Sequence, residues 1–272
     1  QAQVAALWVK VDTIYDNNTT QHFDMIWGSN VAQGTPSGHE VFDLANGFIG
    51  VWHLDSMAED TGAGSVYLSS TTLAGSGIDR VSATGKQGIV GRGQEFDGVD
   101  DYIDCGNQAE FALTSTLTLS CWVKLADTTS DQYYRLVSKK TLWGDSAGFE
   151  LEINTHPTGK GVTFVGRDST LIRSTYTWNT QWHHVAVVIT DTIVKTYVNG
   201  MEMHPYEVVI PKWPLIAGDS PLLIGGIGDS DFVRGHLDEV RLENTARSHA
   251  WLRLCYENQR TNQKLVSMRR DF

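Results

Sequence analysis

The sequence predicts an all-β protein, folded as a sandwich of two antiparallel sheets, and three observations support this prediction. Apolar and polar residues alternate with a period of two over several short segments, as in strands with one buried face. Turn formers separate these segments, and Asn199-Gly200 readily takes the positive φ angles of a tight hairpin. Helical periodicity appears near the end, where residues 245–255 predict one short helix.

The N-terminal region predicts a β-hairpin over residues 1–33. Residues 7–14 and 22–28 alternate as strands, and turn-forming residues lie between them. A linker rich in glycine, proline and serine is expected at residues 34–38. We expect the main domain to span residues 46–258 and a tail to span residues 259–272.

The main domain contains segments with the strand pattern. In residues 117–125 five apolar residues share one strand face, and polar residues occupy most of the other. Residues 149–153 repeat this pattern, with Phe149, Leu151 and Ile153 on one face and Glu150 and Glu152 on the other. We expect the apolar faces to form a shared core and the two glutamates to face solvent.

Composition limits the classes of function. The chain has 272 residues, of which 41% are hydrophobic, so it can bury a sizeable core. Its formal net charge of −11 disfavours binding to nucleic acid or to an anionic membrane surface. No segment approaches the ~20 apolar residues that span a bilayer, and no leader-like segment opens the chain. We therefore expect a soluble protein without direct membrane insertion.

The three cysteines, Cys105, Cys121 and Cys255, are widely spaced and odd in number. No disulfide framework follows from them, and they form no Cys-x-x-Cys pair of the type seen in zinc or redox sites. We expect small buried apolar residues at these positions.

Seven segments, in their order along the chain, resemble the laminin G-like branch of the concanavalin A-like lectin and glucanase jelly rolls. They are residues 47–54, 93–103, 117–124, 148–154, 182–187, 195–200 and 238–241. The resemblance covers roughly residues 47–250 and implies a jelly-roll domain that recognises a ligand at a surface. The N-terminal hairpin resembles the end of a small bacterial β-domain of unknown function that often precedes such modules.

The resemblance also implies a structural calcium ion. Asp97, Asp100, Asp101 and Asp104 lie near one segment, with Asp238 and Glu239 in another, and carboxylates are the hard oxygen ligands that Ca²⁺ prefers. Asp97 and Asp238 are the candidate metal ligands. Many relatives carry an acidic loop after the first strand, where this chain has Leu68, so the sequence departs from the calcium pattern here. In the alternative interpretation, Asp97 and Asp238 accept hydrogen bonds from turn backbone.

Catalysis is the weaker interpretation. Glycosidases with this jelly roll use a Glu-x-Asp-x-x-Glu strand, because hydrolysis needs two carboxyl groups. Glu150 and Glu152 fit its start, but Thr155 occupies the position of the acid/base. His183 and His184 are neighbours in a predicted strand and point to opposite faces, so they cannot converge on one metal or proton.

Aromatic residues in turn-rich segments are the candidate ligand contacts, since exposed rings stack on the apolar faces of sugars. The candidates are Trp143, Trp178, Trp213, Tyr133 and Tyr134. The sequence thus predicts a noncatalytic carbohydrate-binding or adhesive module of a secreted or envelope-associated bacterial protein, located extracellularly, at the cell surface or in the periplasm. The partner would be a glycan or polysaccharide. The alternative is a structural domain that binds another envelope protein, and the third class is a glycoside hydrolase.

Overall fold

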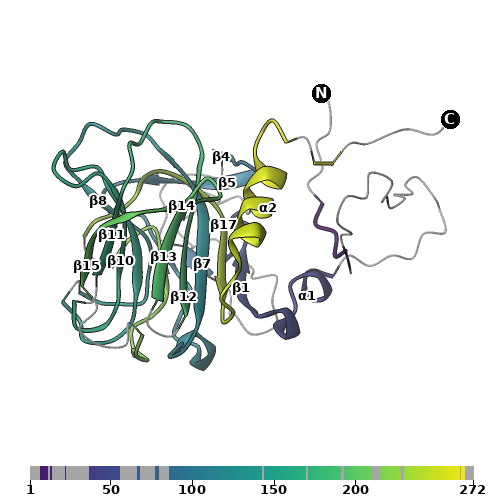
Figure 1. Cartoon of the computed structure of the whole chain (residues 1–272), viewed down its shortest axis with the longest axis horizontal. Coiled ribbons are helices and arrows are strands. Elements are labelled where there is room, and N and C mark those ends of the chain that lie inside the picture. The colour runs from purple at the N-terminus through teal and green to yellow at the C-terminus, as the bar shows by residue number, and fades with distance from the viewer. Residues whose placement is uncertain are drawn as a thin grey trace.

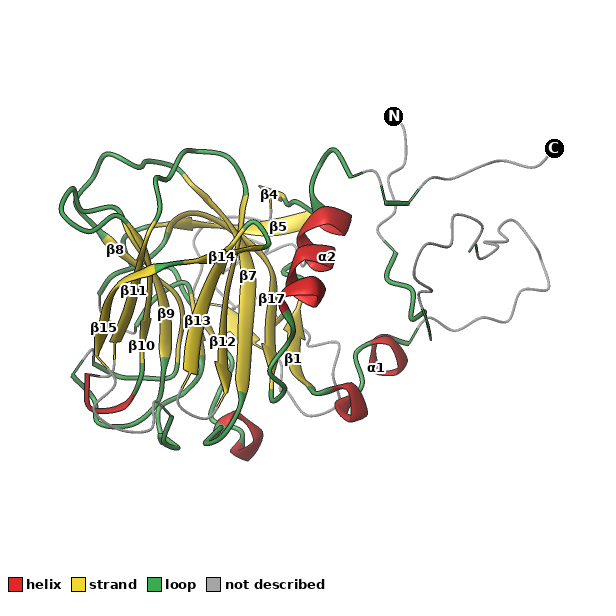
Figure 2. Cartoon of the chain, viewed as in Figure 1, coloured by secondary structure: helices red, strands yellow, loops and turns green. Residues whose placement is uncertain are grey.

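Two antiparallel sheets pack face to face in the computed structural model of the chain (Figures 1 and 2), which confirms the predicted β-sandwich. The structure describes residues 7–11, 13, 22, 37–55, 66–67, 77–79, 86–142, 144–169, 171–190, 193–209, 215–227, 230–263 and 265–266. Every strand pairing found among these residues is antiparallel, as in lectin-like jelly rolls.

Sheet A lies beside the C-terminal helix. Its strands, in spatial order, are β14 (Met201–Met203), β13 (Ile193–Val198), β12 (His183–Thr190), β7 (Leu117–Leu125), β17 (Arg234–Glu243), β5 (Arg92–Asp97) and β4 (Lys86–Gln87), and β1 (Phe48–Trp52) also pairs with β17. A bulge between Asp238 and Arg241 lets β17 pair with β5 in its first half and with β1 in its second.

Sheet B forms the other layer. Its strands, in spatial order, are β15 (Pro205–Val209), β11 (Leu171–Thr175), β10 (Gly161–Val165), β9 (Glu150–Asn154), β8 (Tyr133–Ser138), β16 (Leu223–Ile224), β6 (Ile103–Asp104), β3 (Gly77–Asp79) and β2 (Val66–Tyr67). Short helical segments complete the described chain: α1 (Gly38–Val41), α2 (His249–Gln259) and 3-10 turns at Leu44–Asn46, Ala109–Phe111 and Arg167–Ser169.

The core lies between the sheets and follows the predicted alternation. The apolar residues on one face of β7 are buried and pack in one cluster with Leu151 and Ile153 of β9. They are Leu117, Leu119, Cys121, Val123 and Leu125. Cys105 and Cys121 are buried as free thiols, as expected, and Cys255 is half-buried.

The other face of sheet A is covered by α2, which corresponds to the predicted helix shifted by four residues. Ser248 caps the helix by accepting the Trp251 N–H at 3.2 Å. Tyr256 stacks on Trp122, whose indole N–H donates to Gln259 Oε1 at 2.6 Å. The helix thereby buries a tryptophan that alternation alone would leave on the solvent side.

The predicted hairpin turn is confirmed between β13 and β14. Asn199 and Gly200 both have positive φ angles, 52° and 73°. The Asn199 N–H donates to the His184 carbonyl, and its side-chain oxygen accepts the His184 N–H at 3.0 Å, so the turn is also tied to β12.

Residues 7–11 and 13 of the N-terminal region have no regular secondary structure. The Trp8 ring lies 4.0 Å from the His53 ring, and Lys10 pairs with Asp43 at 2.6 Å. The remainder of the predicted hairpin, Leu68, most of the predicted linker and the end of the tail lie outside the described residues. No helix within the described ranges is long and apolar enough to cross a membrane.

Candidate functional site

The strand register of sheet B places a row of residues on the face turned away from the core. Asp104, Leu223, Ser138, Glu150 and Val165 are partners in turn across β6, β16, β8, β9 and β10. Paired residues of neighbouring strands point to the same face, so these five side chains share the outer face of the sheet. Two differently built regions adjoin along this row.

The first region is a charged cluster formed by Arg135, Glu150, Glu152 and Asp231. Arg135 Nε donates to Glu150 Oε2 at 2.9 Å, and its two terminal nitrogens contact Glu152 Oε2 and Asp231 Oδ2, the latter at 3.1 Å. The Arg135 N–H also donates to the Asp231 carbonyl, so the segment before β17 is held over the sheet. One arginine thus holds three carboxylates, two from β9 and one from the segment before β17.

The expectation that Glu150 and Glu152 face solvent is wrong. Their exposed fractions are 0% and 1%, because Arg135 and the segment around Asp231 cover this part of the sheet. Burial raises the pKa of Glu150 to about 7, against the opposing effect of Arg135, and burial likewise raises the pKa of Glu152. One oxygen of each carboxyl, Oε1, has no hydrogen-bond partner among the described residues.

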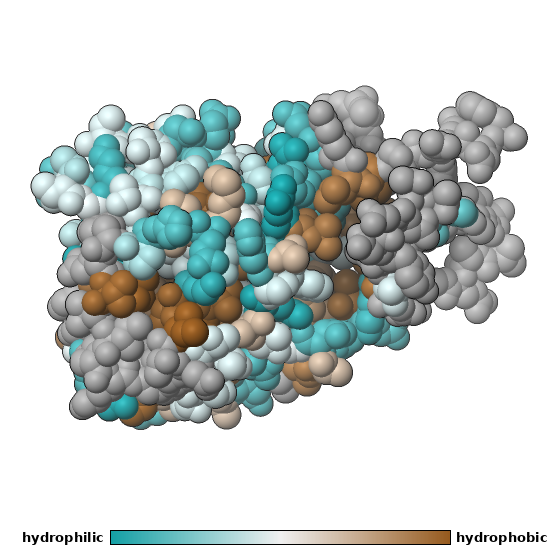
Figure 3. Space-filling model, viewed as in Figure 1, coloured by the Kyte–Doolittle hydropathy of each residue, from teal (hydrophilic) through white to brown (hydrophobic). Residues whose placement is uncertain are grey.

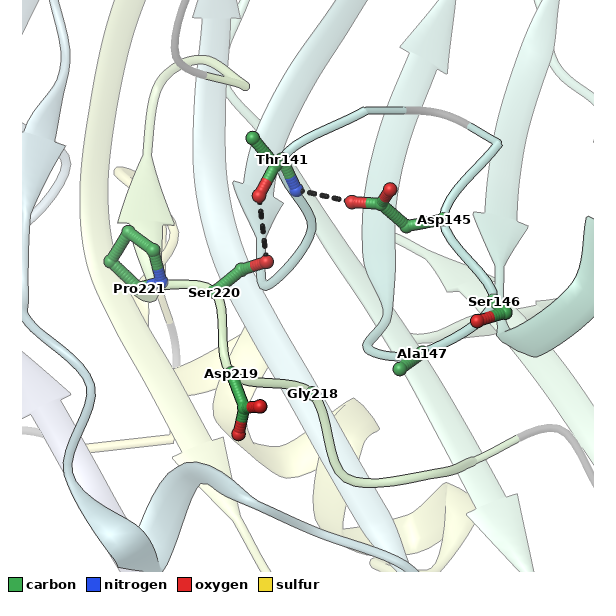
Figure 4. A pocket seen from close by; sticks show the side chains of 8 residues that line it. All are labelled: Thr141, Asp145, Ser146, Ala147, Gly218, Asp219, Ser220 and Pro221. Carbon is green, nitrogen blue, oxygen red and sulfur yellow. Dashed lines mark hydrogen bonds between the residues drawn. The ribbon is translucent and has the colours of Figure 1, made fainter.

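The second region is an open cavity, here called the loop groove (Figure 4). Its volume is about 420 Å³, and its walls are the β8–β9 loop and the segment that precedes β16. Hydroxyls, carboxylates and backbone line it. The lining residues are Thr141, Asp145, Ser146, Ala147, Gly218, Asp219, Ser220 and Pro221.

Hydrogen bonds hold the shape of the groove. Asp145 Oδ2 accepts the backbone N–H groups of Thr141 and Leu142 at 2.7 and 2.9 Å, which fixes the turn of one wall. The Thr141 and Ser220 hydroxyls lie 2.9 Å apart and join the two walls directly, as Figure 4 shows. A second bond, from the Gly148 N–H to the Ile216 carbonyl, also joins the two segments that form the walls.

Two consecutive buried lysines support the walls from below. Lys139 Nζ donates to the Ser220 carbonyl and to Asn107 Oδ1, both at 2.7 Å, while Lys140 Nζ donates to the Asp145 carbonyl at 2.5 Å. Both residues are 1% exposed, and burial lowers the pKa of each. Each lysine therefore ties one wall of the groove to the end of β8.

A smaller recess of about 160 Å³ adjoins the loop groove and shares Thr141 and Pro221 with it. Its other lining residues are Tyr102, Asp104, Lys140, Leu223 and Ile227. The Tyr102 ring is half-buried and stacks against Phe232 at 6.3 Å between centroids. Together the two recesses offer one aromatic ring, apolar side chains, hydroxyls and three carboxylates, which is the chemistry that contacts polyhydroxylated ligands.

The aromatic candidates lie elsewhere or outside the described residues. Trp178 is 5% exposed, and its indole N–H donates to the carbonyls of Asn154 and Gly161, so it links the ends of β9 and β10. Tyr134 is 3% exposed and bonds Ser130 at 3.0 Å. Tyr133 is half-buried, 5.9 Å from the Arg135 guanidinium. Trp143, which the sequence places in the β8–β9 loop, and Trp213 lie outside the described residues. Ligand contact by these five residues stays a prediction.

The two metal candidates are not brought together. Asp97, Asp100 and Asp101 form the group of acidic residues that could hold a metal ion in the described part of the chain, and Asp238 is not a member. Asp97 Oδ1 accepts the Val99 N–H at 2.7 Å, and Asp101 Oδ2 accepts the Asp97 N–H at 2.7 Å. These bonds match the turn-forming role that the sequence offered as the alternative for Asp97.

Asp238 has a different environment, at the bulge of β17. Its Oδ2 accepts the N–H groups of Ile89 and Val90 at 2.8 and 3.0 Å, and a Cβ on Gly88 would lie 2.3 Å from this oxygen. Burial raises the pKa of Asp238 to about 8, with the Glu239 charge adding to the effect. For the neighbouring Glu239, burial is outweighed by hydrogen bonds from His53 and Arg241, so its pKa is lowered.

His183 and His184 point to opposite faces, as predicted. His183 bonds Tyr176 and Asn179, whereas His184 packs edge-on against Trp122 under α2. Burial lowers the pKa of His184 to about 3, so it is neutral at physiological pH.

A sequence model of the concanavalin A-like lectin/glucanases superfamily, of the laminin G type, matches residues 97–253. The chain belongs to this superfamily. The match spans more than half of the chain and includes β7, β9, β12 and β17, which confirms the resemblance noted from the sequence. No protein of curated function matches the chain in sequence.

Solved structures with the same fold include carbohydrate-active proteins. Domain 4 of AbnA, an extracellular arabinanase from Geobacillus stearothermophilus, in complex with arabinotriose, is 16% identical with a TM-score of 0.58, over 76% of this chain and 97% of that one. A Trypanosoma rangeli sialidase is 18% identical with a TM-score of 0.56, over 79% of this chain and 33% of that one. The same sialidase in complex with sialic acid is 16% identical with a TM-score of 0.53, over the same shares. The chain spans about a third of the sialidase, and these likenesses show the fold.

The residues of the loop groove were missed by the sequence prediction. They are short polar residues in two loops, joined by a contact between positions 79 apart in the chain. The available signal is the pair of turn-rich loops around Asp145 and Asp219, since rigid scaffolds often present binding residues on such loops.

Proposed function

We propose that the protein is a noncatalytic carbohydrate-recognition domain of a secreted or envelope-associated bacterial protein, and that the loop groove and its smaller recess hold the saccharide. The observation that carries this proposal is the preorganised cavity itself. Thr141, Ser146 and Ser220 offer hydroxyls, and Asp145 and Asp219 offer carboxylates, on walls already joined by hydrogen bonds. A rigid site binds without the entropic cost of ordering its loops.

The smaller recess supplies what the polar groove lacks. Tyr102, Leu223 and Ile227 present apolar surface next to Asp104 and Lys140. Sugar rings have apolar C–H faces and polar edges, so a ring can lie against Tyr102 while its hydroxyls bond the groups beside it. The binding of arabinotriose by domain 4 of AbnA, which shares this fold, supports a saccharide as the ligand.

The noncatalytic part of the proposal rests on the charged cluster. Glycoside hydrolysis requires an acid and a base or nucleophile that both face the substrate. Glu150 and Glu152, the carboxyl pair that the sequence offered for this role, are buried and held by Arg135. Their position suits a structural ion-pair network rather than attack on a sugar.

A structural calcium ion is a second element of the proposal. The turn between β5 and β6 carries three carboxylates whose oxygens lie within 4.8 Å of one another. We propose that Ca²⁺ braces this turn through Asp97, Asp100 and Asp101, without contact to Asp238.

The alternative, a domain that docks another envelope protein, is favoured by one observation. Leu7, Val9 and Val11 are exposed and alternate along a segment whose other side is held by Trp8 and Lys10. The face seen in Figure 3 is mostly hydrophilic, with apolar residues in small patches. Small patches favour a ligand other than a protein with a broad apolar interface.

The test is a glycan array followed by calorimetry on the full chain. We expect saccharide binding that Tyr102→Ala weakens at least about tenfold, a loss of roughly 1.4 kcal/mol. Tyr133→Ala is the comparison variant, because Tyr133 is a ligand candidate from the sequence that is also half-buried but does not line either recess. Absence of binding to any saccharide would refute the function. A loss of affinity in the Tyr133 variant alone would show that the saccharide binds near Tyr133 and not in the two recesses.

A further inference from the structure

The charges of the loop groove indicate which chemical class of saccharide it binds, an inference that rests on the proposed function. Three carboxylates line the two recesses, from Asp104, Asp145 and Asp219. They come from three separate segments of the chain, and the two recesses adjoin, since Thr141 and Pro221 border both. A ligand that spans both recesses would lie near all three charges.

The carboxylates differ in what holds them. Asp145 is fixed by the backbone of its own turn through Oδ2, and Asp104 Oδ1 accepts the Gly106 N–H at 2.8 Å. Asp219 is exposed on the opposite wall. A carboxylate oxygen accepts hydrogen bonds and donates none when ionised, so these groups bind hydroxyl donors and repel other carboxylates.

The nearby cations do not reverse this charge. Lys139 Nζ is buried, bonds the Ser220 carbonyl and Asn107, and faces the charge of Asp219. Lys140 borders the smaller recess, but its ammonium bonds the Asp145 carbonyl and faces the charges of Glu150 and Asp145. The two lysines therefore stand against three carboxylates. Among the described lining residues there is no arginine, the residue whose forked donors bind carboxylates in pairs.

We propose that the loop groove selects uncharged saccharides and rejects sialic acids, uronic acids and sulfated sugars, with Asp104, Asp145 and Asp219 as the selective residues. Vicinal hydroxyls of a neutral sugar can donate to the carboxylates in pairs, whereas an anionic substituent would lie beside carboxylates without a guanidinium to neutralise it. The overall charge of −11 adds a long-range repulsion of the same sign.

The experiment compares matched ligand pairs by calorimetry on the full chain. Lactose is set against sialyllactose, and galactose trimers against galacturonic acid trimers, at low and at physiological ionic strength. In each pair for which binding is detected, we expect the affinity for the neutral sugar to be at least about tenfold higher than for the acidic one. High salt should reduce this preference, because screening weakens the repulsion.

A charge series at one wall completes the test. Asp219→Asn should reduce the preference severalfold, and Asp219→Lys should remove or invert it. Asp131→Lys is the control, because it changes the net charge equally and is exposed near the start of β8, at the opposite end from the loop groove.

Three outcomes are distinguishable. Neutral preference that follows Asp219 supports the inference. Tighter binding of the acidic member, with or without Ca²⁺, overturns the inference but leaves saccharide binding intact. Failure to bind either member of every pair, together with a negative array, overturns the proposed function and the inference with it.

Discussion

The charged cluster and the loop groove lie on one face of one sheet, yet they handle charge in opposite ways. In the cluster, Arg135 pairs with Glu150 and Glu152 within the molecule, and both of these carboxylates are closed to a ligand. In the groove, Asp145 and Asp219 line a cavity with hydroxyls and remain available to solvent. The carboxylates of β9 are therefore paired within the molecule, while the carboxylates of the two loops are placed to bind.

The largest expected effect comes from breaking the cluster. Arg135→Met would leave two carboxylates buried without their cation, and removal of one partner of a buried pair costs about 3–5 kcal/mol. Urea unfolding at pH 7.5 measures the loss. The triple variant Arg135→Met, Glu150→Gln, Glu152→Gln should recover most of it, because no unpaired charge remains. A loss below about 1 kcal/mol in the single variant would mean that the cluster is not a structural unit.

The next effect is the pH dependence of stability. The pKa of Glu150 is raised from 4.5 to about 7 in the folded protein by burial. Between pH 4.5 and about 7, the folded state therefore keeps a proton on Glu150 that the unfolded chain has already released. This contribution is complete below about pH 4.5 and is lost as the pH rises through about 7, at up to roughly 1.4 kcal/mol per pH unit. Glu150→Gln should flatten the fall in unfolding free energy over this range.

Gln132→Ala is the control for that measurement, since this exposed side chain does not titrate and is not part of the cluster. Its pH profile should run parallel to that of the wild type. Asp238→Asn should also flatten the fall of the unfolding free energy, and over a range that extends to about pH 8, because the pKa of Asp238 is raised by burial and by Glu239. Parallel profiles for Glu150→Gln and wild type would contradict the account of the cluster.

Calcium should have a smaller effect. With a dissociation constant of ~1 mM, typical of extracellular modules, 5 mM Ca²⁺ would stabilise the fold by about 1 kcal/mol, or about 2–4 °C in Tm. Asp100→Asn should abolish the shift and Asp219→Asn should not, since Asp100 belongs to the turn cluster and Asp219 to the groove. Equal shifts in both variants would place the ion elsewhere.

The fold was predictable from the sequence because its signals are local. Alternation in β7 and the Asn199-Gly200 turn depend on residues next to one another, and both were confirmed. The burial of Glu150 and Glu152 shows what such local signals do not predict. Alternation states that they share a face, but Arg135 and Asp231, which cover that face, come from distant segments.

The candidate site depends even more on distant contacts. Thr141 and Ser220 meet only because β8 and β16 are neighbours in sheet B, a pairing that no local pattern encodes. Aromatic residues in turns were a reasonable indicator of ligand contact, yet Trp178 is used to join strand ends. Tyr102 directly follows the acidic turn, and its sequence neighbours indicate a metal site rather than a saccharide contact.

The smallest expected effect tests how the two regions are linked. Lys140 lies between them, with its ammonium on the Asp145 carbonyl of the groove wall and near the charge of Glu150 in the cluster. Lys140→Met should lower saccharide affinity about three- to fivefold, because the wall loses its support. It should leave the unfolding free energy within about 1 kcal/mol of the wild-type value, because a desolvated charge is removed together with its bond.

Lys139→Met should have the same effects through the loss of its bond to Ser220. Lys124→Met, on sheet A and outside both recesses, is the control for the loss of a lysine. If affinity is unchanged in both buried-lysine variants while the fold remains intact, the groove keeps its shape without them, and the cluster and the groove are independent.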